Sequence, residues 1–420
     1  MKKLTVFGAS ILSAALLFGV EAKAEKANIN IFQFKVEIAD AFNDLANEYM
    51  KENPGVQINI ETVGGGSDYG AALRAKMASG NEPEIFNVGG PQDVSDWKDK
   101  LADLSGVPVM KDAFPGTLSG VTLDGKVYGI PFDQEGYGFM YNKAIFEKAG
   151  INAADINSFD KLEAAVKILD SKKSELGLKA VFAVPGKETW VLGLHFSNVG
   201  LANEFANVFD AYNAKTVAFK YSDGMKKLFD LQIKYAKKPV NSVDYSTQVE
   251  QLFSLEKVAI MQQGNWTLGA IKGVNPDLAT RIAFLPMPIV GGKEDCIPVG
   301  TPMYWTVNAS KNQKTQDASK AFLNWMYSSD KGKDAIVNKF GFIPPFKGYD
   351  SESLQPKDPL AKSIMEFVKA GKTISWVFMG YPTGWGMEII GVDLQNYIDG
   401  KITWDKLVAH DKKSWADSRK

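Results

Sequence analysis

The sequence is poor in the residues that build metal sites and nucleophilic catalytic sites. Its 420 residues include one cysteine, Cys296, and two histidines, His195 and His410. One cysteine forms no internal disulfide, and two separated histidines with a distant cysteine lack the ligand spacing of a zinc site. Phosphate-binding loops and G-x-G-x-x-G segments are missing as well. We therefore expect no metal and no cofactor, and expect Cys296 and His195 to be packed, loop or surface side chains.

Runs of basic residues are also absent. Lysine plus arginine number 48 and aspartate plus glutamate 49, which gives a net charge of −1 at pH 7. A chain that recognises nucleic acid through its backbone normally carries a strongly basic surface. Nucleic acid is therefore not an expected partner.

Long apolar runs are limited to one, at residues 4–20. It lies behind two lysines and is followed by Ala22-Lys23-Ala24. This order predicts a signal peptide, residues 1–24, cleaved after Ala24. The alternative is a membrane anchor, but the run is short for the about 20 apolar residues that a bilayer requires. No cysteine stands at the cleavage point, so no lipid anchor is expected, and the mature chain is expected in the periplasm as a monomer.

Strand and helix patterns alternate along the first 90 residues. Residues 28–33 and 56–62 have strand patterns, and residues 38–52 carry apolar side chains at helical spacing. A second helix at 69–79 and a third strand at 84–88 follow. This order predicts an α/β domain with a mainly parallel sheet.

The rest of the chain continues the α/β pattern without a flexible linker. Asp124-Gly125 predicts a type I′ hairpin turn, and Ser158 is expected to cap a helix. A mature chain of this length is expected to form at least two domains, and scattered Pro/Gly-rich loops favour a chain that passes between two lobes more than once. Further strands are expected at 137–141, 180–184, 258–262, 282–285 and 304–308, and further helices at 190–199, 223–236, 246–255 and 316–327.

Acidic and aromatic residues are mixed in residues 125–151, GKVYGIPFDQEGYGFMYNKAIFEKAGI. Asp133 and Glu135 alternate, so they point the same way if the segment is extended. Two carboxylates can hydrolyse a glycosidic bond, or they can accept hydrogen bonds from sugar hydroxyls. The residues by themselves leave binding and hydrolysis both open.

Tryptophans supply the apolar surface that would cover the face of a sugar ring. Trp266 follows Gly264 at the end of an apolar strand, and Trp376 and Trp385 lie in a stretch broken by glycine and proline. We expect Trp266 and Trp385 in a pocket, and Trp376 either in the pocket or in the core. Four further tryptophans are expected to pack in the core: Trp97, Trp325, Trp404 and Trp415.

Residues 125–151 closely resemble the signature of extracellular solute-binding proteins of family 1, the maltose- and multiple-sugar-type receptors of ABC importers. Other segments match in the same order: NPGVQINIE, SGNEPEIFNVGG, VAIMQQGNW, SKN, AFLNWMYS and GFIPPF. One departure is Gln33-Phe34-Lys35, where many relatives carry several tryptophans. The phenylalanine ring of Phe34 is smaller than a tryptophan ring, so the identity and length of the sugar stay open.

The resemblance implies a two-lobed periplasmic-binding-protein fold, type II-like, with a hinge and a ligand cleft between the lobes. One lobe would hold residues 25–138 plus 287–344, and the other 139–286 plus 345–420. Residues 137–141 and 286–288 are the expected hinges. The expected ligand-binding residues are Gln33, Phe34, Glu37, Gly66, Asp68, Gly89, Asp133, Glu135, Trp190, Asn265, Trp266, Gly300, Thr301, Trp376 and Trp385.

The resemblance also implies a binding protein rather than an enzyme. The expected partners are a mono- or oligosaccharide and the membrane subunits of an ABC importer. Two alternatives remain: a secreted glycoside hydrolase that uses Asp133 and Glu135, and a receptor for a non-sugar polar solute. A phosphate ligand would call for arginine or lysine in the cleft, where Lys35 is the nearest candidate cation.

Overall fold

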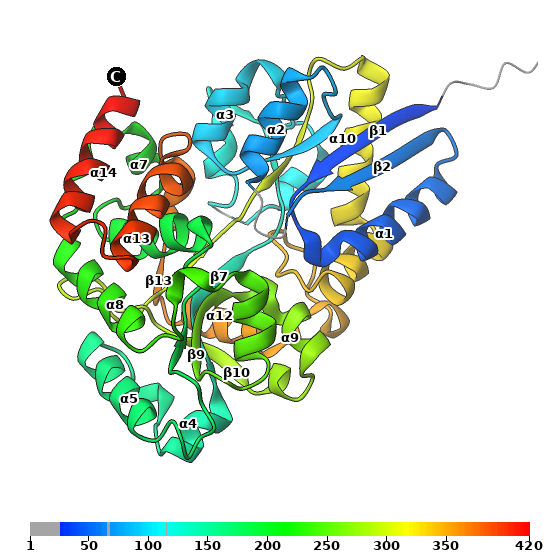
Figure 1. Ribbon diagram of the computed structural model, residues 1–420. Helices are drawn as coiled ribbons and strands as arrows, with labels where there is room; N and C mark the ends of the chain where they lie inside the picture. The colour runs from blue at the N-terminus through cyan, green and yellow to red at the C-terminus, as the bar shows by residue number, and fades with distance from the viewer. Residues whose placement is uncertain (1–25, 65–67, 115) are drawn as a thin grey trace, which may run out of the picture.

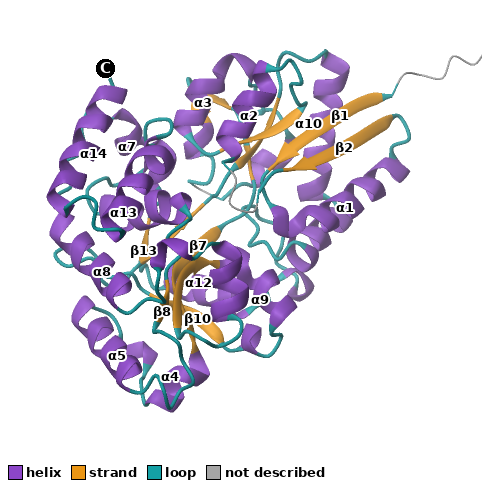
Figure 2. Ribbon diagram, viewed as in Figure 1, coloured by secondary structure: helices purple, strands orange, loops and turns teal. Residues whose placement is uncertain are grey.

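The computed structural model describes residues 26–64, 68–114 and 116–420, and the predicted signal peptide and Gly66 lie outside these ranges. Two α/β lobes lie side by side, each with its own sheet (Figure 1). Helices cover the faces of both sheets (Figure 2). No helix in the described ranges is both long enough and apolar enough to cross a membrane.

The first lobe is built on a five-stranded sheet in the order β2-β1-β3-β12-β6. β1 is parallel to both β2 and β3, and β12 is antiparallel to β3 and β6. Phe42 of α1 packs against Trp305 of β12 and Phe322 of α10, which fixes both helices on the sheet. The elements are β1 (Ala27–Gln33), α1 (Ala39–Glu52), β2 (Val56–Thr62), α2 (Tyr69–Ala78), β3 (Ile85–Val88), α3 (Pro91–Trp97), β4 (Thr122–Leu123), β5 (Lys126–Val127), β6 (Ile130–Pro131), β12 (Tyr304–Val307), α10 (Gln313–Ser328) and α11 (Asp330–Asp334).

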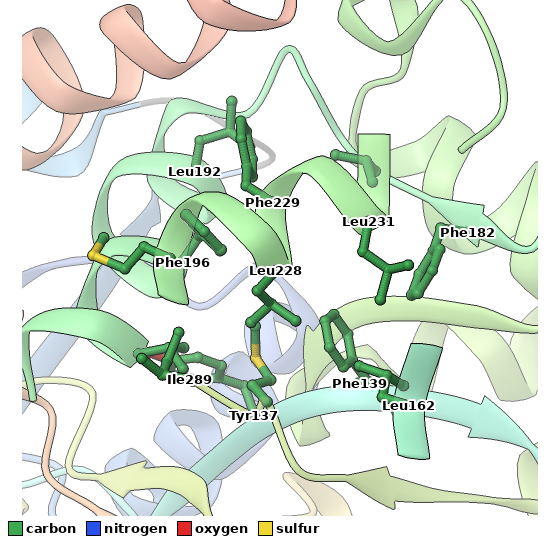
Figure 3. Close-up of a cluster of buried hydrophobic side chains, with 14 of the residues drawn as sticks. Tyr137, Phe139, Leu162, Phe182, Leu192, Phe196, Leu228, Phe229, Leu231 and Ile289 are labelled. Carbon is green, nitrogen blue, oxygen red and sulfur yellow. The ribbon is translucent and has the colours of Figure 1, made fainter. Parts of the chain in front are cut away.

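The second lobe is built on the path β13-β11-β7-β9-β8, with β10 also paired to β7. Its apolar core includes Tyr137 and Phe139 of β7 and Leu228 and Phe229 of α8, and Leu228 points toward the two rings of β7 (Figure 3). The elements are β7 (Glu135–Asn142), α4 (Lys143–Ala149), α5 (Phe159–Ser171), β8 (Phe182–Ala183), α6 (Ser197–Leu201), α7 (Val208–Asn213), α8 (Ser222–Lys234), β9 (Ile260–Gly264), α9 (Leu268–Val274), β10 (Ile282–Leu285), β11 (Ile297–Gly300), α12 (Pro359–Lys369), β13 (Thr373–Ile374), α13 (Gly391–Ile398) and α14 (Trp404–Ser418).

A turn and a helix cap that were predicted from the sequence are present in the structure. Asp124 and Gly125 both have positive φ, 53° and 76°, in the turn between β4 and β5. The Ser158 side chain accepts a hydrogen bond from the Lys161 N–H and caps α5. Two of the expected helices, at 190–199 and 246–255, contain wide π-helical turns, Val191–Phe196 and Thr247–Phe253.

The chain crosses between the sheets at positions that differ from the prediction. β6 belongs to the first sheet and β7 to the second, so residues 132–134 form one crossing, and residues 301–303 between β11 and β12 form another. The two crossings are joined where the Phe132 N–H donates to the Met303 carbonyl at 3.0 Å. A third passage leads from Tyr349, in the first core, to α12 on the second sheet.

Neither predicted hinge is a crossing. Residues 137–141 are the middle of β7, which pairs with β9 and β10, and Met287 is buried in the second core. β11 also pairs with β7, although the predicted division places its residues in the first lobe. A strand hydrogen-bonded on both sides is held rigid, so bending is easier at the short crossings.

Candidate functional site

A cavity of about 360 Å³ lies between the two lobes. The first lobe contributes side chains from the carboxyl ends of β1 and β3, including Phe34, Lys35 and Asp93. The second lobe contributes Glu135, at the start of β7, and rings from the loops around its sheet. Ligands of open α/β sheets bind beyond the carboxyl ends of the strands, which is where β1 and β3 meet this cavity.

Lys35 is the centre of a buried ionic cluster at one side of the cavity. Its ammonium contacts the Glu135 carboxylate and lies 3.1 Å from Glu37 and 3.9 Å from Asp133. The Lys35 side chain is only 2% exposed and the Asp133 side chain is fully buried. Three carboxyl groups therefore share one buried cation, and among the three Glu37 is the most exposed, at 26%.

Burial and charge shift the pKa values within this cluster. Burial raises the pKa of Asp133 well above its ordinary value, against the effect of Lys35, and Glu135 raises it further. Burial likewise raises the pKa of Glu135, and Lys35 opposes that shift. For Lys35, burial favours a lower pKa, but Asp133, Glu135 and Glu37 outweigh it and raise the pKa. Asp133, whose two oxygens have no hydrogen-bond partner among the described residues, is thus the carboxyl that burial most favours in the protonated form.

Aromatic rings form the opposite wall of the cavity. Trp190 lies 6.2 Å, between ring centroids, from both Trp266 and Tyr245. The buried Glu188 fixes two of these residues, because it accepts hydrogen bonds from the Trp190 indole N–H and the Tyr245 backbone N–H, both at 2.8 Å. The rings are thus held in place by the second lobe.

His195 belongs to the same wall and stacks on Tyr137 at 4.3 Å. Burial lowers the pKa of His195 to about 3, so the ring is neutral at physiological pH. From the sequence we expected a packed or surface residue, and in the structure His195 is a packed residue that also lines the cavity. Trp376 and Phe378 complete the wall, and the Trp376 indole N–H has no partner among the described residues.

The lobes touch beside the cavity. A Cβ placed on Gly90 would lie 2.9 Å from the Met379 Cβ, so these backbones approach each other closely. Arg419, near the end of the chain, donates to the Gln92 side chain and to the Gly380 carbonyl, both at 2.6 Å. The lobes are therefore in contact along one rim of the cavity.

Eight of the fifteen predicted ligand-binding residues line this one cavity. They come from both lobes and from widely separated parts of the chain. Gly66 lies outside the described residues. The eight are Phe34, Glu37, Asp68, Gly89, Glu135, Trp190, Trp266 and Trp376.

Three other predicted residues lie behind the cavity wall and position it. The Gln33 side chain accepts from the Lys35 N–H at 2.6 Å and donates to the Lys35 carbonyl at 3.0 Å, which shapes the exit of β1. Asp133 is buried beneath Lys35. Asn265 accepts from the Gly136 N–H at 3.1 Å and so ties the β9 exit to β7.

The last three predicted residues are also outside the cavity lining. Gly300 pairs with Glu135, and a Cβ there would lie 2.6 Å from the Trp376 Cγ, so its role is to leave room for that ring. Thr301 is half-buried, while Pro302 and Met303 line the cavity instead. Trp385 is corrected to a core residue: it is 1% exposed, and its indole N–H donates to Ser414 at 2.9 Å.

Several cavity residues were missed. Tyr245 and Arg74 carry no local motif, because only tertiary packing brings them to the cavity. Phe378 and Met379 lie in residues 376–386, the stretch broken by glycine and proline that also holds Trp376. The irregular composition of this stretch therefore indicated a loop that could reach the cavity.

Two α/β lobes that enclose a cavity lined from both sides define the class of solute-binding proteins. The family model for bacterial extracellular solute-binding proteins matches residues 35–333, and the chain belongs to this family. The family resemblance seen in residues 125–151 is therefore confirmed.

Relatives of known name agree with this assignment. The chain is 23% identical over 380 residues to the multiple sugar-binding protein of Streptococcus mutans, with 86% of each chain covered. It is 24% identical over 296 residues to the melibiose/raffinose/stachyose-binding protein of Bacillus subtilis, with 68% of this chain and 66% of the relative covered.

Solved structures confirm the two-lobed fold. A chitin oligosaccharide binding protein superposes with a TM-score of 0.79 at 22% identity, covering 94% of this chain and 99% of the other. The solute-binding protein RafE in complex with raffinose superposes with a TM-score of 0.74 at 20% identity, covering 94% and 100%.

Proposed function

We propose that this protein binds a mono- or oligosaccharide in the cavity between its lobes and delivers it to the membrane subunits of an ABC importer. The observation that carries the proposal is the composition of the cavity, which combines Trp190 and Trp266 on one side with Glu135 and Lys35 on the other. Rings cover the apolar face of a sugar and charged groups bind its hydroxyls. The printed names of relatives, which include multiple sugar-binding and melibiose/raffinose/stachyose-binding proteins, support the same ligand class.

The mechanism follows from the two lobes. A ligand that contacts both walls shifts the lobes from an open to a closed arrangement. The size of this shift is set by how much more tightly the ligand binds the closed arrangement than the open one. Within the closed cavity, each hydrogen bond to a charged group contributes about 1.5–3 kcal/mol, and a sugar that fails to pair with Glu135 leaves a buried acid unsatisfied. Rejection of the wrong epimer therefore comes from this penalty as well as from the missing contact.

The hydrolase alternative is less well supported by the geometry. Glu135 lines the cavity while Asp133 is fully buried beneath Lys35, so the predicted pair does not flank the space where a glycosidic bond would lie. We therefore assign no catalytic residue.

A receptor for an anionic solute is also less well supported. Lys35 and Arg74 line the cavity, but so do Glu37, Asp68 and Asp93 in addition to Glu135. Lys35 is already surrounded by carboxyl groups, and Arg74 lies 3.7 Å from Glu388. A neutral polar ligand is the better match for this balance of charges.

We further propose that the mature chain is a periplasmic monomer that begins after Ala24. The lobes would be divided at the crossings near residues 132–134 and 301–303, which revises the sequence-based division at 138 and 286. Intact-mass measurement of the exported protein tests the cleavage, and light scattering of the purified chain tests the monomer.

A thermal-shift screen against neutral mono- and oligosaccharides, with anionic solutes included for comparison, tests the main proposal. A ligand that binds only the folded chain raises the melting temperature. We expect at least one sugar to produce a saturable rise, with no release of reducing sugar on long incubation. A screen in which only anionic solutes raise the melting temperature would overturn the proposal.

A further inference from the structure

A side-chain cluster outside the cavity lining joins the last two helices. Asp393 lies in the first turn of α13, and His410 and Asp411 are neighbours on α14, which packs beside α13 (Figure 1). One ligand atom from each of the three side chains lies within 4.8 Å of the others. His410 Nδ1 and Asp393 Oδ2 are 2.5 Å apart. One imidazole and two carboxylates thus converge on one point.

Asp411 has no partner that explains its position. The residue is fully buried, and neither carboxylate oxygen has a hydrogen-bond partner among the residues that the structure describes. An ion pair with lysine or arginine is likewise missing for Asp411 within the described ranges. An unpaired buried carboxylate costs several kcal/mol, so a positive charge, either a proton or a metal ion, must accompany it.

The outer side of the cluster is accessible to solvent. The side chain of His410 is 55% exposed and that of Asp393 is 12% exposed, so the cluster opens to solvent on one side and is closed at Asp411 on the other. Burial, followed by the nearby Asp393, raises the pKa of Asp411 above its ordinary value, as expected for a buried carboxyl beside a second carboxyl. A proton on Asp411 would give it a hydrogen bond to Asp393, and this is the rival occupant.

We propose that Asp393, His410 and Asp411 bind a divalent transition-metal ion of the zinc type, with solvent water completing the coordination. Imidazole nitrogen and carboxylate oxygen are ligands that Zn²⁺ accepts, and three protein ligands plus water is a common open arrangement. Ca²⁺ and Mg²⁺ prefer sites made only of oxygen. No spacing rule finds this site, because Asp393 and His410 are 17 residues apart on different helices.

Such an ion would hold α13 against α14. The Trp385 indole N–H donates to the Asp411 carbonyl at 3.2 Å, and α14 ends next to Arg419, which reaches Gln92 of the first lobe. The role is therefore structural: the ion would brace the C-terminal helix pair that carries one contact between the lobes.

Zinc titration of the tag-free mature chain, freed of metal by a chelator, tests the site. We expect calorimetry at pH 7.5 to show one equivalent of Zn²⁺ bound and the melting temperature to rise. His410→Gln and Asp411→Asn should each lower the zinc affinity at least 10-fold. Asp405→Asn, an exposed acid on the same helix, should leave zinc binding unchanged.

Imidazole NMR provides a readout that does not depend on stability. The chain has two histidines, and the other, His195, is buried in the cavity wall. We expect Zn²⁺ to shift the NMR signals of the His410 ring nitrogens and to leave the signals of the His195 ring nitrogens unchanged. Equal zinc binding by the wild type and His410→Gln, or an unmoved His410 ring at saturating zinc, would overturn the metal site and assign the cluster to a shared proton. Because His410 is exposed, its variant is expected to fold even if Asp411→Asn does not.

Discussion

The ammonium group of Lys35 contacts the carboxylate of Glu135, and this ion pair joins the exit of β1 in the first lobe to the first residue of β7 in the second. Both residues also line the cavity. A ligand that bonds to Glu135 would therefore touch the same group that ties the two lobes together. Ligand contact and lobe arrangement are linked through a single pair of side chains.

Removal of Lys35 tests this pair. Lys35→Met leaves three acidic side chains without their cation, and loss of one partner of a buried ion pair costs about 3–5 kcal/mol. We expect the free energy of unfolding in urea at pH 7 to fall by about that amount. Lys51→Met, at an exposed residue paired only with Glu48, should cost less than about 1 kcal/mol.

A double variant separates the interaction energy of Lys35 with Glu135 from the other effects of each substitution on stability. Lys35→Met combined with Glu135→Gln should be less destabilising than the sum of the single changes, because the second change removes one uncompensated charge. Strict additivity would show that the contact between Lys35 and Glu135 contributes nothing to stability.

Replacement of Trp266 tests the aromatic wall. Trp266→Ala removes a half-buried ring that lines the cavity while the core beneath it stays intact. We expect the affinity for sugar to fall about 10–100-fold, equivalent to about 1.4–2.8 kcal/mol, with little change in melting temperature. Trp97→Ala, in the first lobe outside the cavity lining, serves as the control, and equal losses of affinity in both variants would count against a role for Trp266.

A substitution at Gly90 tests the close contact between the two lobes at Met379. Its backbone is extended, with φ of 176°, so valine is tolerated locally, but the added Cβ would lie 2.9 Å from Met379 of the other lobe. We expect Gly90→Val to weaken sugar binding at least 10-fold and to reduce the ligand-induced decrease in the radius of gyration seen by X-ray scattering. Gly106→Val, where a Cβ meets no atom within 4 Å, should behave like the wild type.

The pH dependence of stability tests the burial of His195. In the folded chain the pKa of His195 is lowered from 6.5 to about 3, so the unfolded chain takes up a proton at a higher pH than the folded chain does. The stability contributed by neutral His195 is complete above pH 6.5 and is lost as the pH falls toward 3. We expect the difference in unfolding free energy between the wild type and His195→Gln to fall by about 1.4 kcal/mol per pH unit in that window. A difference that stays constant with pH would contradict the buried, neutral ring.

Much of the fold follows from local pattern, and the exceptions have physical causes. The strands β1 and β2 and the helix α1 were predicted from periodicity because each buries mainly one regular set of side chains. The resemblance implied hinges at residues 137–141 and 286–288, but β7 pairs with β9 and β10 inside one lobe. The apolar pattern from Tyr137 to Tyr141 correctly predicted a buried strand but does not reveal that pairing.

The site was predicted in part for similar reasons. The alternation of Asp133 and Glu135 predicted that the two side chains point the same way, and in the structure both lie near the Lys35 ammonium. The sequence does not reveal which of them reaches the cavity. Trp385 and Trp376 lie in the same irregular stretch, yet Trp385 packs on Trp415, with ring centroids 4.8 Å apart, while Trp376 lines the cavity. That distinction depends on α14, which is distant in sequence from the motif.

A crystal structure of the chain grown with the sugar that gives the largest thermal shift tests the central claim most directly. We expect a saccharide between the two lobes, with one ring face against Trp266 or Trp190 and at least one hydroxyl within hydrogen-bond distance of Glu135. A sugar bound elsewhere, with the space between Phe34 and Trp266 filled only by water, would contradict it.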